Sequence, residues 1–167
     1  MADEPKAGAD AVLDPAIVER IARAIHQAYR RAQAQSLPED DPSLSPWENL
    51  PETLKRSNRD QAAHIVEKVR LIGCTLHPKQ DGGRRFRFRR GEVDALAAIE
   101  HERWMAQRLA DGWRLGVRRD VLAKTSPYFV PYAELPEPEK VKDRQAVRNI
   151  PRLLARAGLR ISRKAPG

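Results

Sequence analysis

The sequence repeats itself with a spacing of 85 residues, and this repeat constrains the fold more than any other feature. The stretch PWENLPETLKRSNRDQ at 46–61 returns as PYAELPEPEKVKDRQA at 131–146. The correspondence continues without a gap to Gly73 and Gly158. A chain that carries one pattern twice is expected to fold as two related structural units.

The two copies differ most upstream of these stretches. AIHQAY at 24–29 matches IEHERW at 99–104 with a spacing of 75, which pairs His26 with His101 and Tyr29 with Trp104. The second copy therefore carries ten extra residues between its first helix and its proline turn, and the insertion contains DGWRLGVRRD at 111–120. We expect the symmetric part to form the scaffold and the insertion to be the first place to look for function.

Each copy predicts a helix, an irregular proline-rich segment and a second helix. In the first copy, Asp14 and Pro15 are a typical helix start, and Pro51 with Glu52 suits a second one. The prolines of 42–51 exclude regular helix between them. Apolar residues at helical spacing predict the buried faces, at Ile17, Ile21, Ile25 and Ala28, then Ala62, Ile65, Val69 and Ile72.

The second copy follows the same plan. One helix face carries Val93, Leu96, Glu100 and Trp104, and Gly112 is expected to end that helix. Pro151 interrupts the last helix where the first copy has Val66, and predicts a kink or a break. The remaining apolar positions of that helix are in register at Val147, Ile150, Leu154 and Ala157.

The expected fold is mainly α: two pseudo-symmetric helix–proline loop–helix repeats packed as one compact unit, with at most short β-strands. Each repeat alone would bury too little surface. The predicted boundaries are a disordered N-terminus at 1–13, the first repeat at 14–74, a basic linker or short hairpin at 75–92, the second repeat at 93–161 and a tail at 162–167.

Composition narrows the class of protein. The formal net charge of +8 favours anionic ligands or partners. Cys74 is the only cysteine, so an intrachain disulfide is excluded and a reducing compartment is the natural interpretation. The first ten residues lack the apolar run of a signal peptide, and no stretch is apolar enough for a membrane helix. We expect a cytoplasmic protein of bacterial type, without membrane association.

Three motifs follow one another in the second copy: EHERWMAQRLADGW at 100–113, VPYAELPEPEKVKDR at 130–144 and LLARAGL at 153–159. Together they resemble the Ry repeat of ryanodine receptors, which also occurs in bacterial proteins. KRSNRD at 55–60 is similar to the same family in the first copy. The resemblance covers roughly residues 16 to 161 as a tandem pair. It implies a helical, non-catalytic module, and tandem repeats in the channels can hold an adenine nucleotide between aromatic rings.

The resulting hypothesis is a sensor module for an anionic nucleotide, either an adenine nucleotide or a signal similar to cyclic ADP-ribose. Indole faces would stack on the base, and guanidinium groups would bind phosphate. The groove between the halves is the expected location. The candidate ligand-binding residues are His26, Tyr29, Trp47, Arg59, His101, Trp104, Trp113, Arg118, Arg119, Tyr132 and Arg144.

Each of these residues also has a purely structural interpretation. The two histidines could donate a hydrogen bond to the proline loop, and Trp104 could belong to the core. Trp47 and Tyr132 could pack the loop onto the helices, and Arg59 and Arg144 could tie that loop down. Trp113 follows a helix end among arginines, so we expect it to be partly exposed. Arg118 and Arg119 could be solvated surface charges.

Other functions receive less support from the sequence. Two histidines without a cysteine or carboxylate pattern do not predict a metal site, and no nucleophile constellation predicts an enzyme. No cofactor is expected. A first alternative is a protein-interaction or homo-oligomerisation module, or one that serves a fused or neighbouring effector domain. A second is nucleic-acid binding by the segment RRFRFRR at 84–90, although no nucleic-acid fold surrounds it and this partner is not expected.

Overall fold

The computed structural model describes residues 14–120 and 122–165. Within these ranges it contains four α-helices and two small two-stranded sheets, which confirms the mainly helical prediction. The predicted disordered N-terminus at 1–13 lies outside the described residues. The helices are α1 (Pro15–Gln33), α2 (Glu52–Leu71), α3 (Glu92–Ala110) and α4 (Glu137–Arg156). The strands are β1 (Cys74–Pro78), β2 (Arg114–Leu115), β3 (Thr125–Ser126) and β4 (Leu159–Arg163).

The predicted helix starts have the expected chemistry. The Asp14 carboxylate accepts a hydrogen bond from the Ala16 backbone N–H at 2.9 Å, and Pro15 occupies the first turn. The helices α2 and α4 both begin with a glutamate directly after a proline, Glu52 and Glu137. A carboxylate in the first turn is favoured by the helix dipole. Between α1 and α2 the prolines permit only two short 3₁₀ turns, Pro42–Leu44 and Trp47–Asn49.

Three consecutive elements of the first repeat recur 85 residues later. The 3₁₀ turn Trp47–Asn49 matches Tyr132–Glu134, helix α2 matches α4, and strand β1 matches β4, each with the same length. Gly73 and Gly158 follow the two helices with φ of 70° and 75°. This left-handed conformation ends a helix and is easily reached only without a Cβ atom. The sequence repeat is therefore also a repeat of secondary structure.

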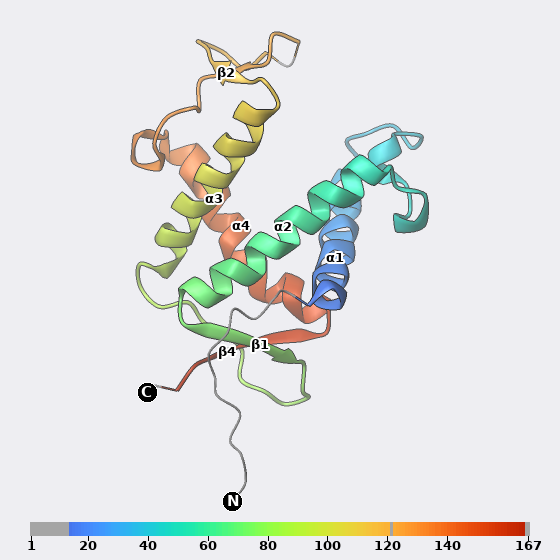
Figure 1. The fold of residues 1–167 in the computed structure, drawn as a ribbon, viewed down its shortest axis with the longest axis vertical. Helices are drawn as coiled ribbons and strands as arrows, with labels where there is room; N and C mark the ends of the chain where they lie inside the picture. The colour runs from blue at the N-terminus through green and yellow to red at the C-terminus, as the bar shows by residue number, and fades with distance from the viewer. Residues whose placement is uncertain (1–13, 121, 166–167) are drawn as a thin grey trace, which may run out of the picture. The chain divides into compact units, whose positions relative to one another are not determined.

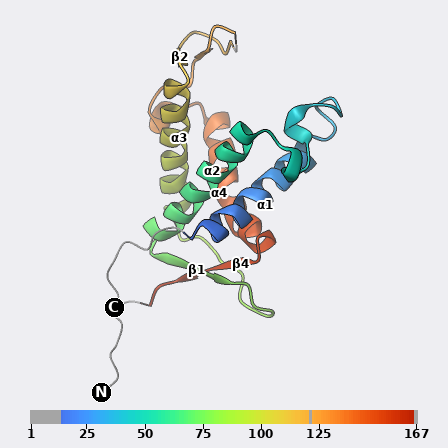
Figure 2. The ribbon, with the colours of Figure 1, turned by 45° about the vertical axis from the view of Figure 1, so that its right-hand side comes forward.

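The chain divides into two compact units, Met1–Arg70 and Leu71–Gly167. The division does not follow the predicted repeat boundary at 74. Strand β1 belongs to the second unit because it pairs antiparallel with β4. In that unit α3 leads away from the sheet, and α4 returns to it and packs against α3 and β4 (Figures 1 and 2).

The pairing of β1 with β4 is symmetric about Leu76 and Ile161, which face each other and are equivalent in the repeat. Equivalent backbone bonds close both ends, from Lys79 N to Gly158 O and from Lys164 N to Gly73 O. The predicted tail at 162–167 is thus partly wrong, since β4 continues to Arg163. Two copies of one strand can pair in this way because an antiparallel ladder is itself twofold symmetric.

Two expectations left alternatives open. Of the kink or break expected at Pro151, the break does not occur, because helix α4 continues through the proline. Packing decides this, because Val147, Ile150 and Leu154 on either side of the proline are all buried. For 75–92 the alternatives were a basic linker and a short hairpin, and the arginine-rich segment 84–90 forms no strand. Strand β1 pairs with β4 and not with the segment that follows it. Residues 79–90 therefore contain no strand.

Candidate functional site

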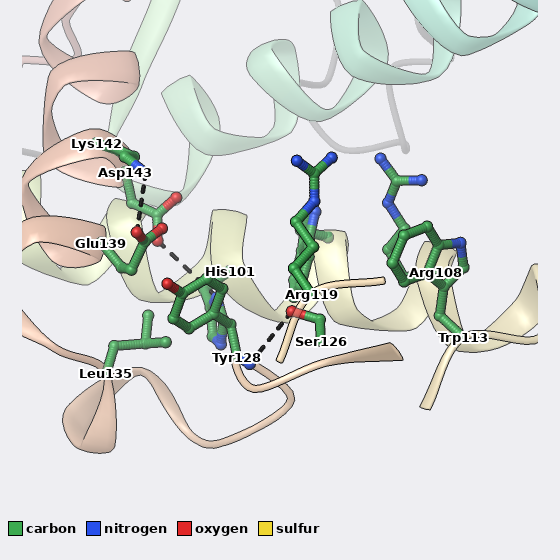
Figure 3. Close-up of a pocket in the computed structure, with 11 residues that line it drawn as sticks. His101, Arg108, Trp113, Arg119, Ser126, Tyr128, Leu135, Glu139, Lys142 and Asp143 are labelled. Atoms are coloured by element: carbon green, nitrogen blue, oxygen red, sulfur yellow. Dashed lines mark hydrogen bonds and ion pairs between the residues drawn. The ribbon is translucent and has the colours of Figure 1, made fainter. Parts of the chain in front are cut away.

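A pocket of about 270 Å³ opens in the second unit, where the ten-residue insertion meets the two helices (Figure 3). Helix α3 contributes His101, Trp104 and Arg108, which lie on one face because their spacing follows the helical repeat. The insertion and the loop after it contribute Trp113, Arg119, Ser126, Tyr128 and Leu135. Helix α4 contributes Glu139, Lys142 and Asp143.

His101 is a buried residue in the lining of the pocket. Its Nε2 atom lies 2.7 Å from the Val130 carbonyl oxygen, which can only accept, so Nε2 carries the proton. Its Nδ1 atom lies 3.9 Å from the Asp143 carboxylate. The equivalent His26 donates from Nε2 to the Ser45 carbonyl, also at 2.7 Å. The structural interpretation of both histidines, a hydrogen bond to the proline loop, is therefore confirmed.

The two tryptophans of the pocket already contact other side chains. Trp104 is half-buried and stacks on His101 and Phe129, with ring centroids 5.6 and 5.1 Å away. Trp113 is only 9% exposed, so the prediction of partial exposure is wrong. The strand β2 that follows it pairs with β3, so the chain on either side of the insertion is held together next to Trp113. The Arg108 guanidinium lies over the Trp113 ring, 5.0 Å from its centroid.

The cations of the pocket are Arg108, Arg119 and Lys142. Lys142 is paired with Glu139 at 2.8 Å. In Figure 3 the guanidinium groups of Arg108 and Arg119 lie at one side of the pocket, and the charged residues of α4 lie at the other. Of the neighbouring predicted arginines, Arg119 lines the pocket, and Arg118 is exposed outside it.

Arg144 and Tyr132 lie in the same unit but outside the pocket, where both contact Asp94 of α3. The Arg144 Nε atom donates to Asp94 at 2.6 Å, and its Nη1 atom donates to Glu137. The guanidinium of Arg144 lowers the pKa of the Asp94 carboxyl, and burial raises the pKa of the Tyr132 hydroxyl. The Tyr132 hydroxyl donates to the same Asp94 at 3.4 Å. These groups fasten the proline turn and α4 to α3.

The first unit repeats that arrangement with its own residues. Arg59 donates to Glu19 at 2.7 Å and to Glu52 at 2.8 Å. The buried Trp47 donates from its indole to Glu19 at 3.1 Å. The Arg59 guanidinium consequently lowers the pKa of the Glu19 carboxyl. Tyr29 is 41% exposed, and its hydroxyl lies 3.4 Å from the Ser43 hydroxyl.

The structure thus brings four predicted residues together in one pocket: His101, Trp104, Trp113 and Arg119. Sequence reasoning missed the other residues of the pocket. Arg108 could have been found, because it follows Trp104 by one helical turn on the same face. Ser126 and Tyr128 give no local signal, since the β2–β3 pairing brings them in. Ser126 is 2% exposed, and its hydroxyl accepts a bond from the Tyr128 N–H at 3.3 Å.

In the parts of the chain that the structure describes, no group of three or more histidine, cysteine or carboxylate side chains is arranged to hold a metal ion. Across residues 14–120 and 122–165, none of the helices has the length and apolarity that crossing a bilayer requires.

Comparison with known families identifies the second repeat. The family model described as RyR domain matches residues 90–163. The match begins just before α3 and ends with the last residue of β4, so it includes every residue that lines the pocket. Residues 90–163 of this chain form an RyR domain.

Proposed function

We propose that this protein is a non-catalytic sensor module that binds a small anionic nucleotide in the pocket of its RyR domain. The observation that carries the proposal is the lining of that pocket: three aromatic rings lie beside two guanidinium groups in one cavity of about 270 Å³. Binding sites of this kind are concave and mostly apolar with a few oriented polar groups. The volume suits the base and sugar, and the phosphate would remain at the rim.

The positions of the two arginines suggest where the base and the phosphate of the ligand would bind. Arg108 covers the Trp113 ring in the free protein. A flat base takes its place on the indole, and the displaced guanidinium is then free to bind phosphate together with Arg119. Planar guanidinium groups bind phosphate with two parallel hydrogen bonds, which a lysine cannot do. Tyr128 supplies the ring that faces the pocket from the loop.

Calorimetry and thermal shift with mono-, di- and cyclic adenine nucleotides test the proposal. We expect saturable binding that Arg119→Ala weakens by about tenfold, the equivalent of one charge-assisted hydrogen bond. Arg118→Ala is the matched control, because it removes the same charge from the neighbouring position outside the pocket. The proposal is wrong if no nucleotide at millimolar concentration stabilises the protein, or if the two variants lose affinity equally.

A second candidate function is protein interaction through the insertion and the residues directly after it. Val117 is 100% exposed, Leu122 is 99% exposed and Leu115 is 60% exposed. Large apolar side chains that gather on one exposed loop favour a partner that covers them. Light scattering measures the molar mass of the wild type and of the double variant Val117→Ser, Leu122→Ser. If the exposed side chains mediate self-association, the wild type is an oligomer and the double variant is a monomer.

A further inference from the structure

A second cavity of about 700 Å³ lies in the same unit, lined by the linker that follows β1, the helix α4 and the strand β4. It shares no lining residue with the pocket of the proposed nucleotide site. We call it the basic groove. Seven cations line it and no carboxylate does. Besides Lys79 they are Arg84, Arg85 and Arg87 of the linker, Arg148 and Arg152 of α4, and Arg160 of β4.

The absence of carboxylates distinguishes this groove from the other arginine-rich places in the described chain. Arg59, Arg144 and Arg163 each bind carboxylates at hydrogen-bonding distance. Arg148 and Arg152 lie four residues apart on exposed positions of α4, so both project from the same face. Like charges at this spacing repel each other. An anion in the groove would relieve that repulsion.

One buried donor in the groove lacks an internal partner. The Nε atom of Arg160 is buried and has no hydrogen-bond partner within the described residues. The Nη2 atom of the same side chain reaches only Gln80, at 3.5 Å. A buried N–H group without an acceptor costs free energy, so the guanidinium of Arg160 keeps hydrogen-bonding capacity that the described residues do not use.

The linker is held in place before any ligand arrives. Arg163 binds Glu92 through two parallel bonds of 2.8 and 2.9 Å. The same guanidinium donates to the Arg87 carbonyl at 3.1 Å and lies over the Phe86 ring, 5.1 Å from its centroid. Phe86 and Phe88 meet edge to face at 5.1 Å. Aromatic rings are thus presented between arginines on a fixed segment.

We infer that the basic groove binds the sugar–phosphate backbone of a single-stranded nucleic acid. A cationic groove that tracks phosphates, with aromatic rings for the bases, is the arrangement that binds single strands without sequence preference. A small polyphosphate would use the arginines but has no base to stack on the two phenylalanines. The nucleotide pocket is a separate site, so this inference does not depend on the proposed function.

Fluorescence anisotropy with the full chain and a labelled single-stranded RNA of about 15 nucleotides tests the inference. We expect binding whose logarithm falls with the logarithm of salt concentration by about 0.7 per phosphate contact. Changing Arg84, Arg85 and Arg87 to glutamine should weaken binding at least tenfold and reduce the slope by about 2. Arg148→Gln with Arg152→Gln tests the α4 side of the groove independently.

The matched control changes Arg20, Arg31 and Arg56 to glutamine, which are exposed and lie in the other unit. It alters the net charge equally and should leave binding unchanged. Equal losses in the two triple variants would mean attraction by net charge alone and would overturn the inference. So would an absence of binding, or full competition by tripolyphosphate at equal phosphate concentration, which would assign the groove to free polyphosphate. Circular dichroism verifies that the variants remain folded.

Discussion

At the scale of single residues, buried polar side chains hold the turns of both repeats. The histidines illustrate this best. His26 and His101 are 3% and 4% exposed, and each donates to the carbonyl directly before a proline. The proline ring prevents a backbone bond from its own nitrogen. The loop therefore depends on side chains for its attachment to the first helix of each repeat.

Replacing His101 with alanine should destabilise the RyR domain by about 2–4 kcal/mol. The variant loses a buried ring and leaves the Val130 carbonyl without a donor. His77→Ala removes an exposed imidazole and should change the free energy of unfolding by less than about 0.5 kcal/mol. Urea unfolding followed by tryptophan fluorescence measures both. Similar midpoints for the two variants would contradict the structural role.

Glu92 should make stability depend on pH. Its hydrogen bonds from Arg163 hold the pKa of its carboxyl below the ordinary value. The stabilisation is complete above the unfolded-state pKa of about 4.3 and is lost as the pH falls through the lower folded-state value. Glu92→Gln should cost about 1–3 kcal/mol at pH 7. This difference from the wild type should shrink at pH 3 in urea titrations; a constant difference would refute the linkage.

At the scale of elements, the second helices of the two repeats differ in one proline, which the second repeat tolerates inside its helix. Both second helices have 20 residues, but α4 carries Pro151 where α2 carries Val66. The ring costs a backbone hydrogen bond in the middle of the helix. The helix continues because Ile150 and Leu154 beside it are 5% and 0% exposed, so their burial keeps both halves aligned.

Pro151→Ala should therefore stabilise the domain, by about 1–3 kcal/mol, because alanine restores the N–H group and removes the steric clash. Pro138→Ala is the control, since Pro138 lies in the first turn of α4, where a proline is tolerated. Thermal and urea unfolding compare the two. A loss of stability in Pro151→Ala would show that the ring packs against the groove in a way that alanine cannot replace.

At the scale of the whole molecule, the boundary of the repeat and the boundary of the compact unit do not coincide. Strand β1 ends the first repeat in sequence and completes the sheet of the second unit in space. In the neighbouring strand β4, Leu159 and Ile161 are buried, with 2% and 7% of their surface exposed. The RyR domain at 90–163 therefore uses a strand from outside the matched segment.

A fragment of residues 71–167 should unfold cooperatively in urea, whereas a fragment of 90–167 should lose several kcal/mol or its cooperative transition. The shorter fragment lacks β1, which leaves the backbone of β4 without its ladder. Fluorescence of Trp104 and Trp113 follows unfolding in both. Identical midpoints would mean that β1 contributes nothing to the unit.

Local patterns were sufficient for much of this protein. Capping residues, proline positions and apolar spacing predicted the four helices, because those signals act within one turn of the chain. The offset of 85 predicted the equivalent histidines and arginines, because equivalent positions in a repeat have equivalent neighbours. The same reasoning left 75–92 open between a linker and a short hairpin, because the alternation in 84–90 does not show whether a partner strand is available, and the structure has no strand at 84–90.

The repeat, the helices and the RyR character could thus be inferred from residue order, since each depends on neighbours close in the chain or on a copied pattern. The pocket and the basic groove could not. Ser126 and Tyr128 reach Trp113 only through the β2–β3 pairing, and Arg160 meets Arg84 only because β4 lies beside β1. These residues come close together only through contacts between segments that are distant in sequence, and local sequence preferences do not determine such contacts.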